Sequence, residues 1–315
     1  MNHDSQNLLV APGRQYGLAI RIALFGAMLV AMPKVCAAHP GLHHDIERVA
    51  ALLVDHPDCS ELYLQRAYYH RLEGDLFAAL SDLHHAWQRD PTDSTIALET
   101  ALTLSGLGEY SRAMEQIDQF FLSGGSSARG FVERARLKIQ DGDCDGAILD
   151  FNSAIELKPD VEVFVERGEI QERLGRWNDA AVGYREGLLK TEGAHVLNAA
   201  LIRTEIARAQ YDAALAIIEE EIQKAAVPAE WNLQKAEVLK AAGRNTEATE
   251  VLRQALNHAH VAIQRKSTAF NLYTRARVYL ALGERTEAIG DLQAARLKAP
   301  RFQKVSELLG EMNAD

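Results

Sequence analysis

Small and apolar residues recur along most of this chain with a period of 34 residues. Successive blocks begin at Ser60, Ser94 and Ala128. Each block carries alanine at position 8, glycine at position 15 and alanine at position 20: Ala67, Ala101 and Ala135; Gly74, Gly108 and Gly142; Ala79, Ala113 and Ala147. A fixed period of this length predicts a series of stacked, similar units.

Each block predicts two antiparallel helices, called helix A and helix B below. Glycine at position 15 ends helix A, because glycine adopts the left-handed backbone without steric cost. Proline near position 32 ends helix B, as at Pro91, Pro159 and Pro300. Small residues at positions 8 and 20 let the helices cross closely, and a large residue at position 24 fills the remaining space. No unit buries enough surface alone, so stability is expected from stacking.

The pattern predicts seven units in all. The fifth unit is the least regular, because Arg208 stands where glycine is expected, although Ala213 and Ile217 hold positions 20 and 24. An insertion, residues 260–268, precedes the last unit. The predicted bounds are 60–93, 94–127, 128–160, 161–193, 194–228, 229–259 and 269–302.

These recurring positions resemble the tetratricopeptide repeat family over residues 60–302. The resemblance implies an all-α fold, a right-handed α-solenoid of about seven helix-turn-helix units. Both ends of such an array need capping helices for solubility. We expect the first cap in residues 39–59, as an amphipathic helix over Leu42–Val54, and the last in residues 303–315, over Gln303–Met312.

The resemblance also implies that positions 2, 5, 9 and 12 of helix A line a groove that binds a segment of another protein. Glu162, Glu166, Glu169 and Glu172 form a stripe at spacings of three and four in the fourth unit. Such close like charges are unfavourable unless something offsets them. The candidates are Arg129 and Arg136 of the preceding unit or a basic partner segment, and the alternative is a solvated face. The other candidate partner-binding residues are Tyr68, Arg71, Glu237, Tyr273 and Arg277.

A second regularity links positions 7 and 23. Units 1, 3 and 7 have arginine at the first and aspartate at the second, which predicts structural ion pairs between helix A and helix B. Unit 2 has Thr100 and Gln116 instead, and unit 4 has Arg167 facing Gly183. The three predicted pairs are Arg66 with Asp82, Arg134 with Asp150, and Arg275 with Asp291.

The first 38 residues have the features of a signal peptide. A polar stretch with Arg14 and Arg21 precedes an apolar run over Ile22–Met32, and small residues follow before His39. The run is too short for a membrane span, which needs about 20 residues. We therefore expect an exported chain, periplasmic or secreted, that keeps no membrane span after cleavage. Of the cysteines that remain, Cys59 and Cys144 lie more than two units apart, so both are expected to be unpaired.

Composition and motifs narrow the function further. A net charge of −10 argues against nucleic-acid binding, and 47% hydrophobic residues argue against wholesale disorder. Metalloprotease, nucleotide-binding and redox motifs are absent from the sequence, so neither catalysis nor a cofactor is expected. The preferred prediction is a non-catalytic scaffold that binds a basic and apolar protein segment. The alternative is a periplasmic metal-binding or metal-delivery protein that uses His39, His43 and His44, since cleavage after Ala38 would leave His39 at the N-terminus.

Overall fold

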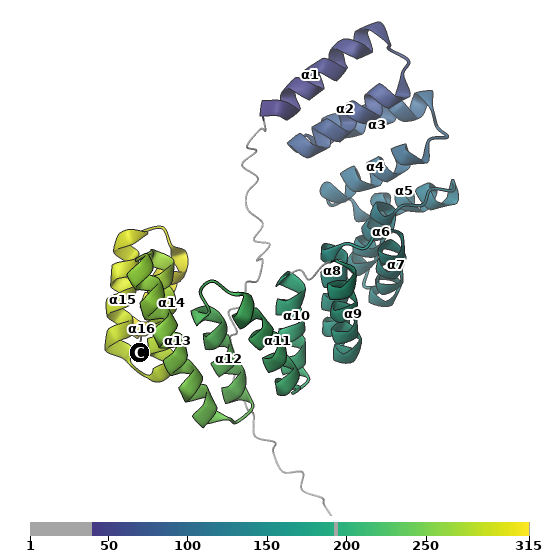
Figure 1. The fold of residues 1–315 in the computed structure, drawn as a ribbon. Coiled ribbons are helices and arrows are strands. Elements are labelled where there is room, and N and C mark those ends of the chain that lie inside the picture. The colour runs from purple at the N-terminus through teal and green to yellow at the C-terminus, as the bar shows by residue number, and fades with distance from the viewer. Residues whose placement is uncertain (1–39, 192–194, 315) are drawn as a thin grey trace, which may run out of the picture. The chain divides into compact units, whose positions relative to one another are not determined.

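A computed structural model describes residues 40–191 and 195–314, and all regular structure within these ranges is α-helical (Figure 1). The predicted signal peptide and His39 lie outside the described residues. Among the residues that are described, none of the helices combines the length and the apolar character that crossing a membrane requires.

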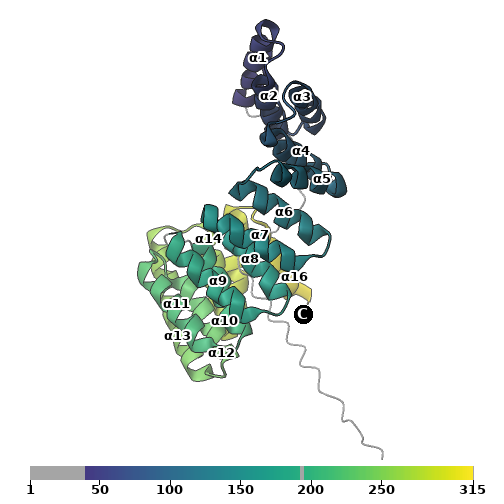
Figure 2. The same cartoon turned by 90° about the vertical axis from the view of Figure 1, so that its right-hand side faces the viewer.

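Seven consecutive helix pairs make up the array, and each helix A packs against its own helix B and against the preceding helix B. Figures 1 and 2 show the pairs following one another in chain order. The A helices are α2 (Ser60–Glu73), α4 (Ser94–Gly106), α6 (Ala128–Gln140), α8 (Val161–Arg173), α10 (His195–Ala207), α12 (Ala229–Ala241) and α14 (Ala269–Leu282). The B helices are α3 (Leu76–Arg89), α5 (Tyr110–Leu122), α7 (Cys144–Leu157), α9 (Trp177–Lys190), α11 (Tyr211–Lys224), α13 (Asn245–Arg265) and α15 (Arg285–Lys298). The predicted all-α solenoid of seven helix-turn-helix units is confirmed.

Two further helices cover the ends of the array, as predicted. The first, α1 (Pro40–Asp55), packs against α2 and buries Val49 and Leu53. The last, α16 (Gln303–Ala314), packs against α15 and buries Val305 and Leu309. Both helices therefore remove apolar surface of a terminal unit from water, which an open repeat array would otherwise expose.

Small and large residues occupy the interior in the predicted alternation. Alanine at positions 8 and 20 is almost fully buried in the first three units, and the large residue at position 24 is buried beside it, as Leu83, Ile117 and Phe151. Unit 4 departs from this, with Gly168 at position 8 and the fully buried Tyr184 at position 24. The smaller residue on helix A makes room for the larger ring on helix B.

The position of the turn after helix A shows that the predicted register of the fifth unit is shifted by one residue. Six units place glycine there with φ between 72° and 93°: Gly74, Gly108, Gly142, Gly175, Gly243 and Gly283. In unit 5 the left-handed residue is Ala209, with φ of 58°, so Arg208 is not the equivalent position. The predicted start at residue 194 was therefore wrong by one residue. Ala214 and Ile218, not Ala213 and Ile217, are the fully buried residues of α11 at positions 20 and 24.

Replacing Ala209 by glycine should stabilise the protein by about 1 kcal/mol, because an L-residue pays about this much in the left-handed region. Ala209 is exposed, so the methyl group that is lost contributes little packing. The measurement is the free energy of unfolding in urea. The matched control, Ala207→Gly two residues earlier at the end of α10, should instead destabilise. An equal loss in both variants would contradict the assigned strain.

The insertion before unit 7 extends a helix. Helix α13 continues to Arg265, and the Asn271 side chain then donates to the carbonyl oxygens of Lys266 and Ala262 at 2.8 and 3.3 Å. Thr268 caps α14 by accepting from the Asn271 backbone amide. Elsewhere, Cys59 and Cys144 are both free, as predicted.

Candidate interaction face

The candidate site is the helix-A face, defined as positions 2, 5, 9 and 12 of the seven A helices. Its charged side chains pair between units more often than within them. Such cross-unit pairs join residues about 30 positions apart in sequence, and they determine which charges of the face remain available. The cross-unit ion pairs of this face fall into three groups.

The first group centres on Glu99 of α4. Its side chain is 8% exposed, and its carboxylate accepts a hydrogen bond from Arg71 of α2 at 3.2 Å and another from Arg129 of α6. Arg71 also lies over the ring of Tyr68, 5.4 Å from the centroid. Arg129 was expected to offset the glutamates of unit 4, but in the structure it pairs with Glu99 of unit 2. Glu99 stands at position 6 of helix A, as Glu166 does in unit 4, but it was not among the candidate residues.

The second group covers the glutamate stripe of α8. Arg136 of α6 donates to both carboxylate oxygens of Glu166, at 2.5 and 3.0 Å, and reaches Glu162 at 3.4 Å. These hydrogen bonds and charges raise the pKa of Arg136 above its ordinary value. Arg136 therefore offsets the stripe as the sequence suggested.

Glu172, the last member of the stripe, is also engaged. It accepts from Arg203 of α10 at 3.0 Å, from the Thr204 hydroxyl at 2.5 Å and from the Tyr184 hydroxyl at 3.3 Å. Burial, with a contribution from Glu172, raises the pKa of Tyr184. Arg203 occupies position 9 of unit 5 in the corrected register, so the one-residue error concealed it. Within the described residues, Glu169 is the exposed stripe carboxylate that has no ion pair.

The third group joins α12 and α14. Arg277 binds Glu230 and lies 3.7 Å from Glu237, and its guanidinium is 5.9 Å from the centroid of Tyr273. Burial raises the pKa of Glu237 above its ordinary value, and Glu230 adds to this, although the charges of Arg277 and Lys240 act in the opposite direction. Burial likewise raises the pKa of Tyr273, whose ring packs against Phe302. This cluster therefore holds a carboxylate whose charge is incompletely compensated beside aromatic surface.

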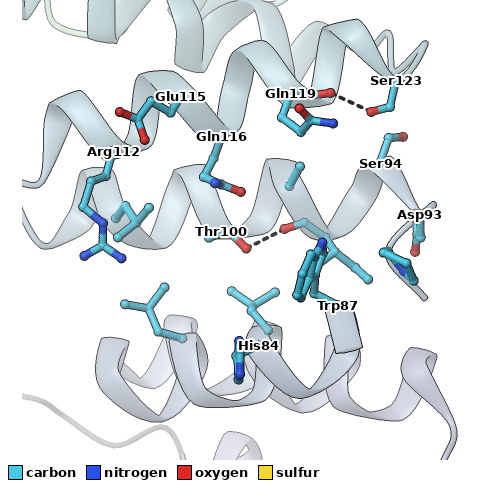
Figure 3. Close-up of a pocket in the computed structure, with 16 residues that line it drawn as sticks. His84, Trp87, Asp93, Ser94, Thr100, Arg112, Glu115, Gln116, Gln119 and Ser123 are labelled. Carbon is cyan, nitrogen blue, oxygen red and sulfur yellow. Dashed lines mark hydrogen bonds between the residues drawn. The ribbon is translucent and has the colours of Figure 1, made fainter. Parts of the chain in front are cut away.

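A cavity of about 580 Å³ lies elsewhere, between α3, α4 and α5 (Figure 3). His84 and Trp87 of α3 face Gln116 and Gln119 of α5 across it, and Thr100 of α4 lies between them. None of its lining residues belongs to the helix-A face. The sequence offered no direct signal for a cavity here.

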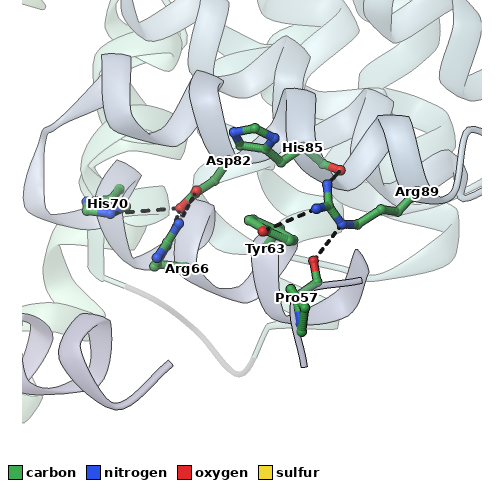
Figure 4. A network of polar contacts seen from close by, with 7 residues as sticks. All are labelled: Pro57, Tyr63, Arg66, His70, Asp82, His85 and Arg89. Carbon is green, nitrogen blue, oxygen red and sulfur yellow. Dashed lines mark hydrogen bonds and ion pairs between the residues drawn. The ribbon is translucent and has the colours of Figure 1, made fainter. Parts of the chain in front are cut away.

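The three arginine–aspartate pairs lie between helix A and helix B in one repeated geometry. Each guanidinium donates twice to one carboxylate, at 2.6 and 2.7 Å in unit 1, 2.6 and 2.9 Å in unit 3, and 2.7 Å for both bonds in unit 7. Figure 4 shows the first pair, Arg66 with Asp82, beside His70 and Arg89. The pairs involve Arg66 and Asp82, Arg134 and Asp150, and Arg275 and Asp291, with each aspartate buried.

Two histidines of the alternative prediction, His43 and His44, lie side by side in sequence on α1. His43 lies 3.4 Å from Glu47 and 4.0 Å from Glu73, and both His43 and His44 are exposed. His39 lies outside the described residues. The part of the chain that the structure describes contains no group of three or more candidate ligands that could hold a metal ion. The helix-A face offers paired charges and aromatic surface.

Searches for relatives give structural neighbours alone, since neither the protein-family profiles nor the curated proteins yield a match. A tetratricopeptide repeat protein from Parabacteroides merdae is 20% identical, with a TM-score of 0.47, covering 81% of this chain and 99% of that one. The C-terminal part of a TPR repeat-containing protein from Cytophaga hutchinsonii is 14% identical, with a TM-score of 0.48 and coverage of 85% and 94%. PilF from Pseudomonas aeruginosa is 14% identical, with a TM-score of 0.48 and coverage of 80% and 97%.

The fold is established by the chain itself. Seven helix pairs repeat the same left-handed turn, a buried alanine at position 20 and a buried large residue at position 24. Six of them have alanine or glycine at position 8, and unit 5 has the buried Ile202 there. A helix at each end covers the terminal pair. With these features in place, the described residues form the α-solenoid of helix-turn-helix units that the tetratricopeptide resemblance predicts.

Proposed function

We propose that this protein is a non-catalytic interaction scaffold of the cell envelope, and that it binds a segment of another protein along the helix-A face. Export rests on the signal-peptide features of residues 1–38, which would deliver the chain to the periplasm or the exterior. The observation that carries the binding role is the series of cross-unit ion pairs on that face.

Those pairs prepare the face for association. Long side chains such as Arg136 and Arg203 already hold one orientation, so a partner orders fewer of them when it binds. Ordering costs of this kind amount to about 0.5–1.5 kcal/mol for each long side chain that binding immobilises. A face whose charges are fixed in advance therefore binds more tightly for the same contact area.

The unpaired features of the face indicate the chemistry of the partner. Glu169 lacks an ion pair among the described residues, and Glu237 shares Arg277 with Glu230. Tyr68 and Phe270 leave 40% and 49% of their surface exposed on the same face. A segment that carries lysine or arginine together with apolar side chains complements both, because it neutralises the carboxylates and covers the rings.

The proposal predicts which charges the partner needs. Glu169→Lys combined with Glu237→Lys should lower recovery of the partner at least about tenfold, when tagged protein expressed with residues 1–38 is used to capture partners from the envelope fraction. Glu156→Lys combined with Glu287→Lys changes net charge equally on exposed helix-B positions and should capture as the wild type does. Two outcomes would contradict the proposal. In one, the Glu169→Lys and Glu237→Lys double variant captures the partner as well as the control double variant does. In the other, no partner is captured from the envelope fraction.

A pH series adds a readout that identifies Glu237. Its pKa is raised in the free protein, and a bound cation would lower it, so binding a basic segment releases a proton. Capture should therefore weaken as the pH falls through the raised pKa of Glu237, where the carboxylate becomes neutral. Glu237→Gln should weaken capture at neutral pH and flatten this part of the pH dependence.

A further inference from the structure

The cavity between α3, α4 and α5 lies where unit 2 departs from the repeated pattern at positions 7 and 23. Unit 5 also departs from it at position 7 of helix A, but there the buried Leu201 occupies the position. In units 3, 4, 6 and 7, position 7 of helix A carries a cation that contacts helix B of its own unit, of the preceding unit or of both. These residues are Arg134, Arg167, Lys235 and Arg275. In unit 2 the same position holds Thr100.

Two of these cations show what fills the equivalent space. Arg134 lies over the ring of Phe121 on α5, 3.9 Å from its centroid, and binds Asp150 on α7. Arg167 joins Asn152 on α7, at 2.7 Å, to Glu186 on α9, at 2.8 Å. A guanidinium therefore bridges consecutive B helices at these two places.

Unit 2 leaves the corresponding space open. The Thr100 hydroxyl donates to the carbonyl oxygen of Ile96 in its own helix, at 2.7 Å, and does not extend between α3 and α5. Position 23 is Gln116 rather than aspartate. The space that the position-7 cation would enter is therefore part of a solvent-open cavity of about 580 Å³, which lies within the size range of ligand sites (Figure 3).

The lining supplies the groups that a guanidinium needs. Trp87 is 54% exposed and stacks with the ring of His84, so an aromatic face is available to a cation. Across the cavity, Gln116 and Gln119 present amide oxygens and Glu115 a carboxylate. The cationic lining residue, Arg112, is balanced by its own pair with Glu109.

We infer that this cavity binds an arginine side chain of a partner protein, which takes the place of the position-7 cation between α3 and α5. The guanidinium would lie on the Trp87 ring and donate to Gln116 and Glu115, as Arg134 lies on Phe121 and donates to Asp150 in the next unit. This contact goes beyond the proposed function, because it uses helix-B residues and none of the helix-A face.

The test titrates the full chain with a blocked Gly-Arg-Gly tripeptide and with its lysine and citrulline counterparts. The readout is the NMR signal of the Trp87 indole, which Trp87→Phe distinguishes from those of Trp177 and Trp231. We expect a saturable shift with the arginine peptide and an affinity at least about tenfold lower for citrulline, which has the same shape without the charge. No saturable shift up to millimolar peptide, or equal binding of citrulline, would overturn the inference.

The decisive variant fills the cavity from within. Thr100→Arg combined with Gln116→Asp recreates the pair that unit 3 contains, so it should fold, melt at a higher temperature and lose the response to the arginine peptide. Trp87→Ala and Glu115→Gln, which leave the cavity unfilled, should each weaken binding and serve if the double variant does not fold. Binding to Trp87→Ala is followed by titration calorimetry, because this variant lacks the indole signal. Glu169→Lys with Glu237→Lys should bind the peptide normally, which separates this site from the helix-A face. Unchanged binding in the double variant, or in both Trp87→Ala and Glu115→Gln, would overturn the inference.

Discussion

Replacing Gly168 by alanine should destabilise the protein by about 1–3 kcal/mol, although alanine is the residue that most other units carry at position 8. A Cβ atom at Gly168 would lie 2.3 Å from two ring atoms of Tyr184. The ring is fully buried, and its hydroxyl is hydrogen-bonded to Glu172, so it has no free space to enter. Overpacking should therefore outweigh the roughly 1 kcal/mol by which alanine favours a helix.

Gly290→Ala is the matched control for this prediction. Gly290 lies on the exposed side of α15, and an added Cβ would meet no atom within 4 Å. The substitution should stabilise the protein by about 0.5–1 kcal/mol, which is the helix-propensity gain alone. Urea unfolding followed by far-ultraviolet circular dichroism measures both. If Gly168→Ala gained stability as Gly290→Ala does, the ring of Tyr184 would have to be mobile. Tyr184→Leu added to Gly168→Ala should recover part of the loss.

The fit of Tyr184 against Gly168 illustrates what the sequence can predict. Unit boundaries follow from local requirements, since a left-handed turn favours glycine and a close helix crossing favours alanine. Where the local requirement is met by an unusual residue, the prediction fails, as at Ala209. The 34-residue spacing from Gly175 would have located that turn, because the period depends on the whole unit and not on one residue.

The candidate site was predictable to a smaller extent. Pairs within a unit, such as Arg66 with Asp82, follow from the fixed geometry of one helix hairpin. Pairs between units depend on how far one helix A is displaced against the next, which the sequence does not specify. For this reason Glu99 was missed and Arg129 was assigned to the wrong neighbour. The cavity was missed for a related reason. Thr100 and Gln116 depart from the arginine and aspartate of units 1, 3 and 7, but this departure indicates a cavity only when the positions of α3 and α5 are known.

The pair of Arg134 and Asp150 should be the most costly of the three to break. Asp150 is 3% exposed and accepts two hydrogen bonds from Arg134, and Lys138 lies 2.8 Å from the same carboxylate. Ion pairs on an exposed surface contribute at most about 1 kcal/mol. Asp150→Ala instead leaves two cations in a half-buried site, and should cost about 3 kcal/mol. Asp291→Ala in unit 7, where a single arginine loses its partner, should cost less.

A paired replacement separates the lost attraction from the uncompensated charge. Arg134→Met combined with Asp150→Leu keeps apolar bulk between α5 and α7 and leaves Lys138, which can turn toward the Gly146 carbonyl 3.4 Å away. Because a buried ion pair gains little over apolar packing, this variant should unfold within about 1 kcal/mol of the wild type. Urea unfolding of the two variants and the wild type measures the difference. A double variant as unstable as Asp150→Ala would show that the ion pair itself stabilises unit 3, and that its loss cannot be offset by packing.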